Sequence, residues 1–157
     1  MKIIYTNPDG STSILTPNDK YQLSDIFPEV EEMTDDEYIN FIRVKYIPQE
    51  ATNVRVINSS DIPQDRSFRA ALKTDLTFDI DKCVEITKNR LRNERAPLLA
   101  ELDAENIRAL EDGSLTIDII AEKKRLRDIT LIPNNKMTLD DLKAIKAVRV
   151  KKNDKSK

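Results

Sequence analysis

The chain has 157 residues, of which 34% are charged and only 5% aromatic, and it contains neither histidine nor tryptophan. So few large apolar side chains favour an elongated molecule with much exposed helix surface over one compact core. A net charge of −2 gives no global reason to bind nucleic acid or an anionic membrane, and the lack of histidine excludes a histidine-based catalytic triad or metal site.

The single cysteine and the short apolar start bear on where the chain works. Cys83 has no partner for a disulfide within the chain, so a reducing compartment is the expected setting. Cys83 lies in a helical pattern without a histidine to activate it, which favours a small buried side chain over a nucleophile. The apolar run at Met1–Tyr5 is too short for a signal peptide, and charges interrupt every longer window, so no membrane span is expected.

The first eighty residues predict short strands and one helix. Two β-type runs, Lys2–Tyr5 and Ser13–Thr16, flank a turn sequence with proline and glycine and predict a hairpin. A capping box at Thr34 opens a helix over Asp35–Lys45, whose apolar face is expected to pack on the hairpin. Alternating β-branched residues predict a strand at Asn53–Ile57, and Leu76–Ile80 is interpreted as a short strand that leads into a helix.

A long helix is predicted from Asp81 to Glu111. Apolar or small side chains recur along it at near-heptad spacing, at Val84, Thr87, Leu91, Leu98, Leu102, Ala109 and Leu110. Pro97 removes a backbone hydrogen bond and is expected to kink or split the helix near Arg95. The stripe is longer than the helix that follows can cover, so part of it is expected to contact the N-terminal domain or another chain.

The chain is then expected to turn back on itself. Gly113 is the predicted left-handed cap of the long helix, and an antiparallel helix follows over Leu115–Ile129. Ile117, Ile120, Ala121 and Lys124 share one side of this helix, and Ile119, Leu126 and Ile129 broaden its apolar face. Thr138 is expected to cap a last helix over Leu139–Val148.

Together these elements predict an α+β fold with three parts. Residues 1–79 form a small α+β domain with a β-hairpin, a further strand and a helix. Residues 80–148 form a long antiparallel helical hairpin with a short C-terminal helix. Residues 149–157 form a basic disordered tail, which is interpreted as solvated rather than as a binding patch.

No enzyme, cofactor or metal site is expected. Glycine occurs only at positions 10 and 113, so no phosphate-binding loop can be written. Acidic clusters at Glu29–Glu32 and Asp35–Glu37 allow a carboxylate-only Mg²⁺ or Ca²⁺ site as one interpretation, but acidic residues that favour a helix dipole are the preferred one. A glycosidase-type carboxylate pair would lack the aromatic platforms usual in sugar sites.

Two sets of residues are candidate partner-binding groups. In the run from Asp61 to Arg69, Phe68 could anchor a docking loop while Arg66 and Arg69 act as forked donors; alternatively, Phe68 simply plugs the domain.

The second set comprises Arg90, Arg92 and Arg95 of the long helix. They could bind an acidic partner, or pair with Glu101, Asp103 and Glu105, or form a solvated face. We expect all three arginines to stay solvated in the free protein, where folding would gain little from them.

The run Asp61-Ile62-Pro63-x-Asp65-Arg66-x-Phe68-Arg69 resembles a segment common in proteins of tailed bacteriophages and prophages. The similarity extends over residues of about 50 to 146 and departs at Leu72, where an aromatic residue is usual. Similar positions downstream are Asp81-Lys82, Ile86, Arg90, Arg92, Arg95, Pro97-Leu98-Leu99, Leu102-Asp103, Lys123-Lys124, Leu126-Arg127-Asp128-Ile129-Thr130, Thr138-Leu139 and Leu142-Lys143. The C-terminal layout is similar to that of tail-fibre assembly and tail-assembly chaperone proteins.

The resemblance implies a phage-encoded accessory protein that binds another protein. It would act as a tail or tail-fibre assembly chaperone or as a minor structural component of the virion, in the host cytoplasm or in the virion itself. A phage tail or fibre protein is the expected partner, with a homo-oligomer as a further expectation and no cofactor, nucleic acid or membrane. The alternative is a counter-defence protein that blocks a host immune enzyme by stoichiometric binding.

Overall fold

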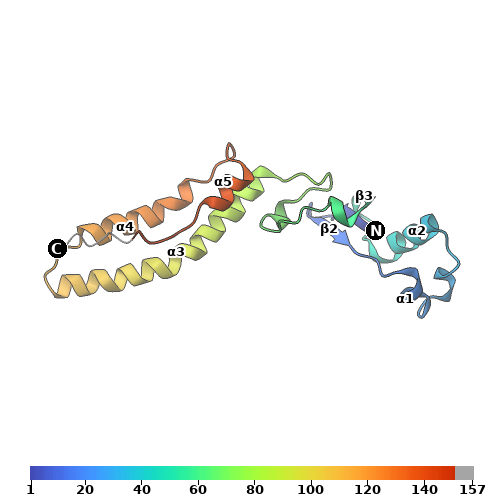
Figure 1. Ribbon diagram of the computed structural model, residues 1–157, viewed down its shortest axis with the longest axis horizontal. Helices are drawn as coiled ribbons and strands as arrows, with labels where there is room; N and C mark the ends of the chain where they lie inside the picture. The colour runs from blue at the N-terminus through green and yellow to red at the C-terminus, as the bar shows by residue number, and fades with distance from the viewer. Residues whose placement is uncertain (151–157) are drawn as a thin grey trace. The chain divides into compact units, whose positions relative to one another are not determined.

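The computed structural model describes residues 1–150, which fall into two compact units with their boundary between Asp79 and Ile80. Figure 1 shows the elements of each unit in chain order. The fold is α+β: a three-stranded antiparallel sheet with short helices precedes a long helix that packs against a second helix and a short C-terminal helix. The predicted fold class is therefore confirmed.

The sheet of the first unit has the strand order β2-β1-β3. Strands β1 (Lys2–Thr6) and β2 (Thr12–Leu15) form the predicted hairpin, and β3 (Thr52–Ile57) pairs antiparallel with the other edge of β1. Gly10 closes the hairpin turn with a φ of +79°, a conformation that glycine adopts without steric cost. The bounds of these three strands lie within one residue of those predicted from the sequence.

One face of the sheet carries the helices α1 (Lys20–Ser24) and α2 (Asp35–Tyr46). The predicted capping box is present, because Thr34 accepts the amide hydrogen of Glu37 while the Glu37 carboxylate accepts that of Thr34. The apolar face of α2 packs on the hairpin as expected. The core between them is made of side chains from β1, the helices and their connections: Ile3, Tyr5, Leu23, Val30, Tyr38, Ile42 and Ile47.

The other face of the sheet meets the irregular segment 58–79. Side chains alternate along β1, so Ile4 points away from α2, and it is fully buried. The strand predicted at Leu76–Ile80 is wrong. Leu76 has a left-handed φ of +68° inside a tight turn, in which the amide of Lys73 bonds to the carbonyl of Thr77 at 2.8 Å. Only a single bridge, between Leu72 and Phe78, has β geometry here.

In the second unit, α3 runs without a break over Ile80–Glu111, with Pro97 inside it. Of the two effects predicted for Pro97, the split is therefore wrong, while the kink stays a prediction; Figure 1 shows that α3 changes direction along its length. Proline costs the helix one backbone hydrogen bond. Tertiary packing on both sides of it, through the fully buried Leu91 and the almost fully buried Leu102, favours continuing the helix through that position.

The turn after α3 is a Schellman motif. Gly113 has the predicted left-handed conformation, with a φ of +69°, and the amides of Gly113 and Ser114 bond to the carbonyls of Leu110 and Ala109. Helix α4 (Ile117–Asp128) then returns along α3.

The apolar face predicted for α4 is buried only in part. Leu126 is fully buried and Ile119 packs on the same core, whereas Ile117 and Ile120 are exposed. The apolar residues of α4 cover more than half of its circumference, so spacing alone did not identify the side that faces α3.

The last helix is shorter than predicted. Helix α5 (Leu139–Ala144) begins with the expected capping box between Thr138 and Asp141, but it ends at Ala144 instead of Val148. Ile145 is already extended, with φ −68° and ψ 123°. Residues 145–150, here called the C-terminal strap, run from α5 between α3 and α4 (Figure 1). The predicted tail thus overlaps the strap at Arg149 and Val150, and its remainder, 151–157, lies outside the described residues.

Candidate interaction surfaces

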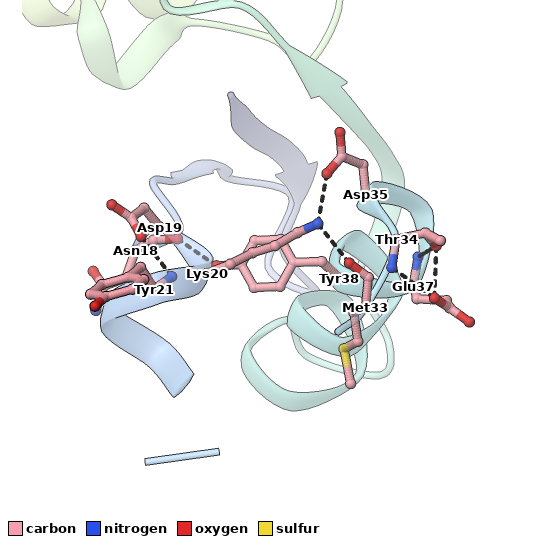
Figure 2. Close-up of polar contacts among 9 residues, drawn as sticks. All are labelled: Asn18, Asp19, Lys20, Tyr21, Met33, Thr34, Asp35, Glu37 and Tyr38. Atoms are coloured by element: carbon pink, nitrogen blue, oxygen red, sulfur yellow. Dashed lines mark hydrogen bonds and ion pairs between the residues drawn. The ribbon is translucent and has the colours of Figure 1, made fainter. Parts of the chain in front are cut away.

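A polar cluster ties α1 to the start of α2 (Figure 2). The Lys20 ammonium group donates to the carbonyl of Met33 at 2.8 Å and to the Asp35 carboxylate at 2.7 Å, and it lies 5.7 Å from the centre of the Tyr38 ring. The hydrogen bond and the charge of Lys20 lower the pKa of Asp35. Tyr38 donates to the carbonyl of Asn18, and burial is the largest cause that raises its pKa.

The carboxylates of this cluster serve the fold. Glu37 completes the cap at Thr34, whose amide and hydroxyl lower the pKa of the Glu37 carboxyl. Among the described residues, no group of three or more acidic or cysteine side chains is placed to hold a metal ion. The acidic start of α2 is thus accounted for by capping and by the pair with Lys20.

The predicted docking residues of the first unit separate into buried and exposed ones. Phe68 is only 5% exposed, so it fills the interior and is not available as an anchor for a partner. Arg66 and Arg69 are exposed, and both line a pocket of about 250 Å³ together with Lys2. We call this the basic pocket; its other lining residues are Ile14, Thr16, Ile62, Pro63, Asp65, Leu72 and Phe78.

The predicted arginines of α3 differ from one another. Arg90 is half-buried and donates to the carbonyls of Leu142 and Ile145, at 3.0 and 2.8 Å. Arg95 reaches the end of α4, where it donates to the carbonyls of Leu126 and Arg127. The last carbonyls of a helix have no hydrogen-bond donor within it, and these two guanidinium groups supply the missing donors.

The expectation that all three arginines stay solvated is therefore wrong for Arg90 and Arg95. Arg92 is exposed and bonds only to Asn89 of the same helix among the described residues. Arg92 alone keeps the position expected of a free surface cation.

Charged side chains hold the strap along one side of the hairpin. The amide of Ala147 donates to Glu94 at 2.9 Å, and Arg149 forms a two-pronged pair with Glu105 at 2.6 and 2.5 Å. The amide of Val150 donates to Glu122 at 3.0 Å. From the sequence, Glu105 was named only as a possible partner of the α3 arginines, and none of these carboxylates was given a role in binding the strap, because the strap was predicted partly as a helix and partly as a free tail.

Glu122 is the most strongly perturbed carboxyl group of this side. Arg125 donates to both of its oxygens at 2.7 Å. These hydrogen bonds, helped by the amide of Val150 and opposed by burial, lower the pKa of Glu122 to about 2. The carboxylate therefore remains ionised and bonded to the strap at any pH near neutrality.

The opposite side of the hairpin exposes large aliphatic side chains. Ile107 and Leu110 on α3 and Ile117 and Ile120 on α4 are between 55% and 68% exposed. We call these four residues the uncovered face. Leu115, in the turn between the helices, is exposed beside it in sequence.

Helix geometry places the strap and the uncovered face on different sides. Successive side chains of a helix are rotated by roughly 100° about its axis. About the axis of α3, Leu110 is therefore rotated by roughly 80° from the buried Leu102 in one direction, and Glu105 by roughly 60° in the opposite direction. On α4, by the same count, Ile120 and Glu122 lie on opposite sides of Ile119. Because α3 and α4 are antiparallel, the same sense of rotation leads to the same side of the hairpin. The strap contacts Glu105 and Glu122, so it covers the side of the hairpin that lies opposite the uncovered face.

Comparison with protein families, with curated proteins and with solved structures finds no match to this chain. The resemblance of residues of about 50 to 146 to phage proteins therefore stays a prediction. Across residues 1–150, no helix combines the length and the apolar character needed to cross a membrane.

Proposed function

We propose that this chain is a protein-binding accessory protein whose working surface is the uncovered face of the helical hairpin. The observation that carries the proposal is the exposure of Ile107, Leu110, Ile117 and Ile120 on one side of two packed helices. A side chain of this kind gains roughly 1.5–3 kcal/mol when it is fully buried, so a partner that covers several of them gains a substantial driving force.

The spacing of these residues suits a helical partner. Ile107 and Leu110 are three residues apart on α3, and so are Ile117 and Ile120 on α4. Leu110 and Ile120 lie nearer the contact between the two helices, so the apolar stripe of a third helix can pack across both.

The positively charged side chains beside the uncovered face favour an acidic partner helix. Lys124 and Arg127 are exposed and follow Ile120 at helical spacing, so they continue the same line along α4. Arg92 adds an exposed cation on α3, turned in the same sense from the helix interface. The partner would carry carboxylates beside its apolar stripe, which would set its register on the hairpin.

The biological setting that we propose rests on sequence resemblance alone. The partner would be a phage tail or fibre protein, and this chain an assembly chaperone or a minor virion component. The alternative partner is a host immune enzyme that the chain blocks by binding.

A crosslinking experiment tests the surface. A photo-crosslinking residue is placed at position 120 of the full chain, and capture from phage-producing cells is compared with and without the further substitutions Leu110→Asp/Ile117→Asp. The control is Val44→Asp, which changes a still more exposed aliphatic residue of the first unit. We expect the double variant to lose at least about tenfold of the captured partner, and the control none, since buried aliphatic anchors dominate such interfaces.

The crosslinked peptide then identifies the partner. An amphipathic helix with acidic flanks, from a virion protein or from a host enzyme, supports the proposal and decides between the two settings. Equal capture by the double variant would contradict the proposal. A crosslink to a second copy of the chain would show that the uncovered face mediates self-association and does not bind an acidic helix.

A further inference from the structure

The basic pocket of the first unit gathers cations from two parts of the chain. Lys2 begins β1 and is half-buried, and it lies on the sheet face that meets segment 58–79. Arg66 and Arg69 come from that segment, and a turn holds them together: the amide of Arg69 bonds to the carbonyl of Arg66 at 3.1 Å. A turn of this kind brings the first and the last of its four residues close together.

The turn is fixed by buried neighbours. Phe68, between the two arginines, is 5% exposed, and the amide of Ala71 bonds to its carbonyl at 2.8 Å. A buried aromatic side chain at this position restricts the backbone from which both guanidinium groups project. The two arginines are therefore presented by an ordered support, which lowers the entropy cost of using them together.

The charge of the pocket is not balanced locally. Its lining contains Lys2, Arg66 and Arg69 but only one carboxylate, Asp65. One oxygen of Asp65 already accepts the amide hydrogen of Ser67 at 2.8 Å. An excess of positive charge in a chain of net charge −2 makes this pocket a local site for an anion.

The size and the remaining walls narrow the kind of anion. A pocket of about 250 Å³ is smaller than the usual small-molecule site, of roughly 300–1,000 Å³, so it suits one side chain or one chain end better than a nucleotide. Ile14, Ile62 and Phe78 add apolar walls. A fitting ligand carries an anionic group on a short aliphatic body.

We propose that the basic pocket binds a carboxylate of a protein partner, presented on a short aliphatic group. Arg66 and Arg69 hold the carboxylate through their forked donors, Lys2 adds a third cation, and the apolar walls contact the methylene or methyl groups. Two sources share this chemistry: a C-terminal residue with an aliphatic side chain, and a glutamate side chain. The site lies in the first unit and does not depend on the proposed function of the hairpin.

Titrations of the full chain with small probes test this site. N-acetyl-leucine presents a terminal carboxylate, N-acetyl-glutamic acid α-amide a side-chain carboxylate, and N-acetyl-leucinamide the aliphatic body without the anion. Inorganic phosphate serves as a general anion. The signals followed are the side-chain N–H resonances of Arg66 and Arg69 in ¹⁵N-labelled protein, with Arg43, an exposed arginine of α2, as internal control.

We expect saturable shifts at Arg66 and Arg69 with at least one carboxylate probe, at a Kd on the order of 1–10 mM. The stronger of the two carboxylate probes identifies the source. N-acetyl-leucinamide should bind at least about tenfold more weakly, because it lacks the charge that the arginines pair with. Equal shifts with the amide, equal shifts at Arg43, or tighter binding of phosphate than of either carboxylate would overturn the proposal.

Variants complete the test. Arg66→Gln/Arg69→Gln should abolish the response of a backbone amide in the pocket, such as that of Ile62, while Arg43→Gln leaves it unchanged. If the double variant does not fold, Lys2→Gln is expected to weaken binding by about threefold with an unchanged far-UV spectrum. An unchanged Kd in Lys2→Gln and in either single arginine variant would also overturn the assignment.

Discussion

The two sides of the helical hairpin carry different kinds of residue and differ in what covers them. On one side, Glu94, Glu105 and Glu122 bind the strap through its backbone amides and through Arg149. On the other side, Ile107, Leu110, Ile117 and Ile120 have no segment of the described chain over them that would reduce their high exposure. The polar side is thus complete within the chain, whereas the apolar side is not.

The two sides contribute differently to the stability of the fold. The hydrogen bonds to the strap replace the water that its backbone groups and the carboxylates lose on folding. These bonds therefore stabilise the folded state. Exposed aliphatic side chains contribute little to folding, because they remain in water in the folded state as in the unfolded one. The exposure of four of them together on one side is the basis of the partner-binding surface proposed above.

The largest effect is expected from breaking the core beneath both sides. Leu102→Ala removes an almost fully buried side chain of α3 and should lower the free energy of unfolding by about 2–5 kcal/mol. Ile120→Ala on the uncovered face should change it by less than about 0.5 kcal/mol. Urea denaturation of both variants measures the contrast, and similar losses for the two would show that the uncovered face is part of the core.

The next effect sharpens the comparison through two neighbouring arginines. Arg90→Ala removes the donor to the carbonyls of Leu142 and Ile145, where α5 ends and the strap begins, and should cost about 1–3 kcal/mol. Arg92→Ala should cost less than about 0.5 kcal/mol, because its guanidinium is exposed. Thermal unfolding of the matched pair checks this, and an equal effect would mean that the strap is not held by Arg90.

A smaller effect appears in the pH dependence of the strap side. The pKa of Glu122 is lowered to about 2 in the folded chain, below its ordinary value of 4.5. A carboxyl group whose pKa is lowered in the folded state stabilises the fold at pH values above its ordinary pKa. This stabilisation is lost as the pH falls from about 5 towards 2. For this partly exposed pair we expect about 1 kcal/mol. Glu122→Gln should flatten the dependence between pH 5 and 3; an unchanged slope in denaturation curves would contradict the assignment.

The smallest effect should be stabilising. The side-chain oxygen of Asn106 on α3 is buried without a hydrogen-bond partner among the described residues. Asn106→Leu should raise the free energy of unfolding by about 0.5–1 kcal/mol, since an unsatisfied buried acceptor costs more than an apolar group in its place. Exposed Asn89→Leu is the matched control on the same helix. A loss of stability in Asn106→Leu would show that this oxygen has a partner in solution.

Local chemistry accounts for the elements that were predicted correctly. The caps at Thr34 and Thr138, the left-handed Gly113 and the turn at Gly10 each depend on residues within a few positions of one another. Strand β3 and helix α3 follow from β-branched content and from helical spacing over many residues. Such signals are readable because the groups that interact are neighbours in the chain.

Other features depend on contacts between distant parts of the chain. The α+β class and the hairpin of helices were predictable from the residues, whereas Phe68 was left with two alternatives, a docking anchor or an interior side chain. Only the packed structure ended α5 at Ala144, sent the strap along α3 and made Arg90 a cap for distant carbonyls, over a separation of more than fifty residues. It also chose which side of α4 faces inward, because both sides carry isoleucines and only contact with α3 distinguishes them. Long-range contacts of this kind leave no periodic trace in the chain, and that is why the strap and the uncovered face could not be predicted from the residues alone.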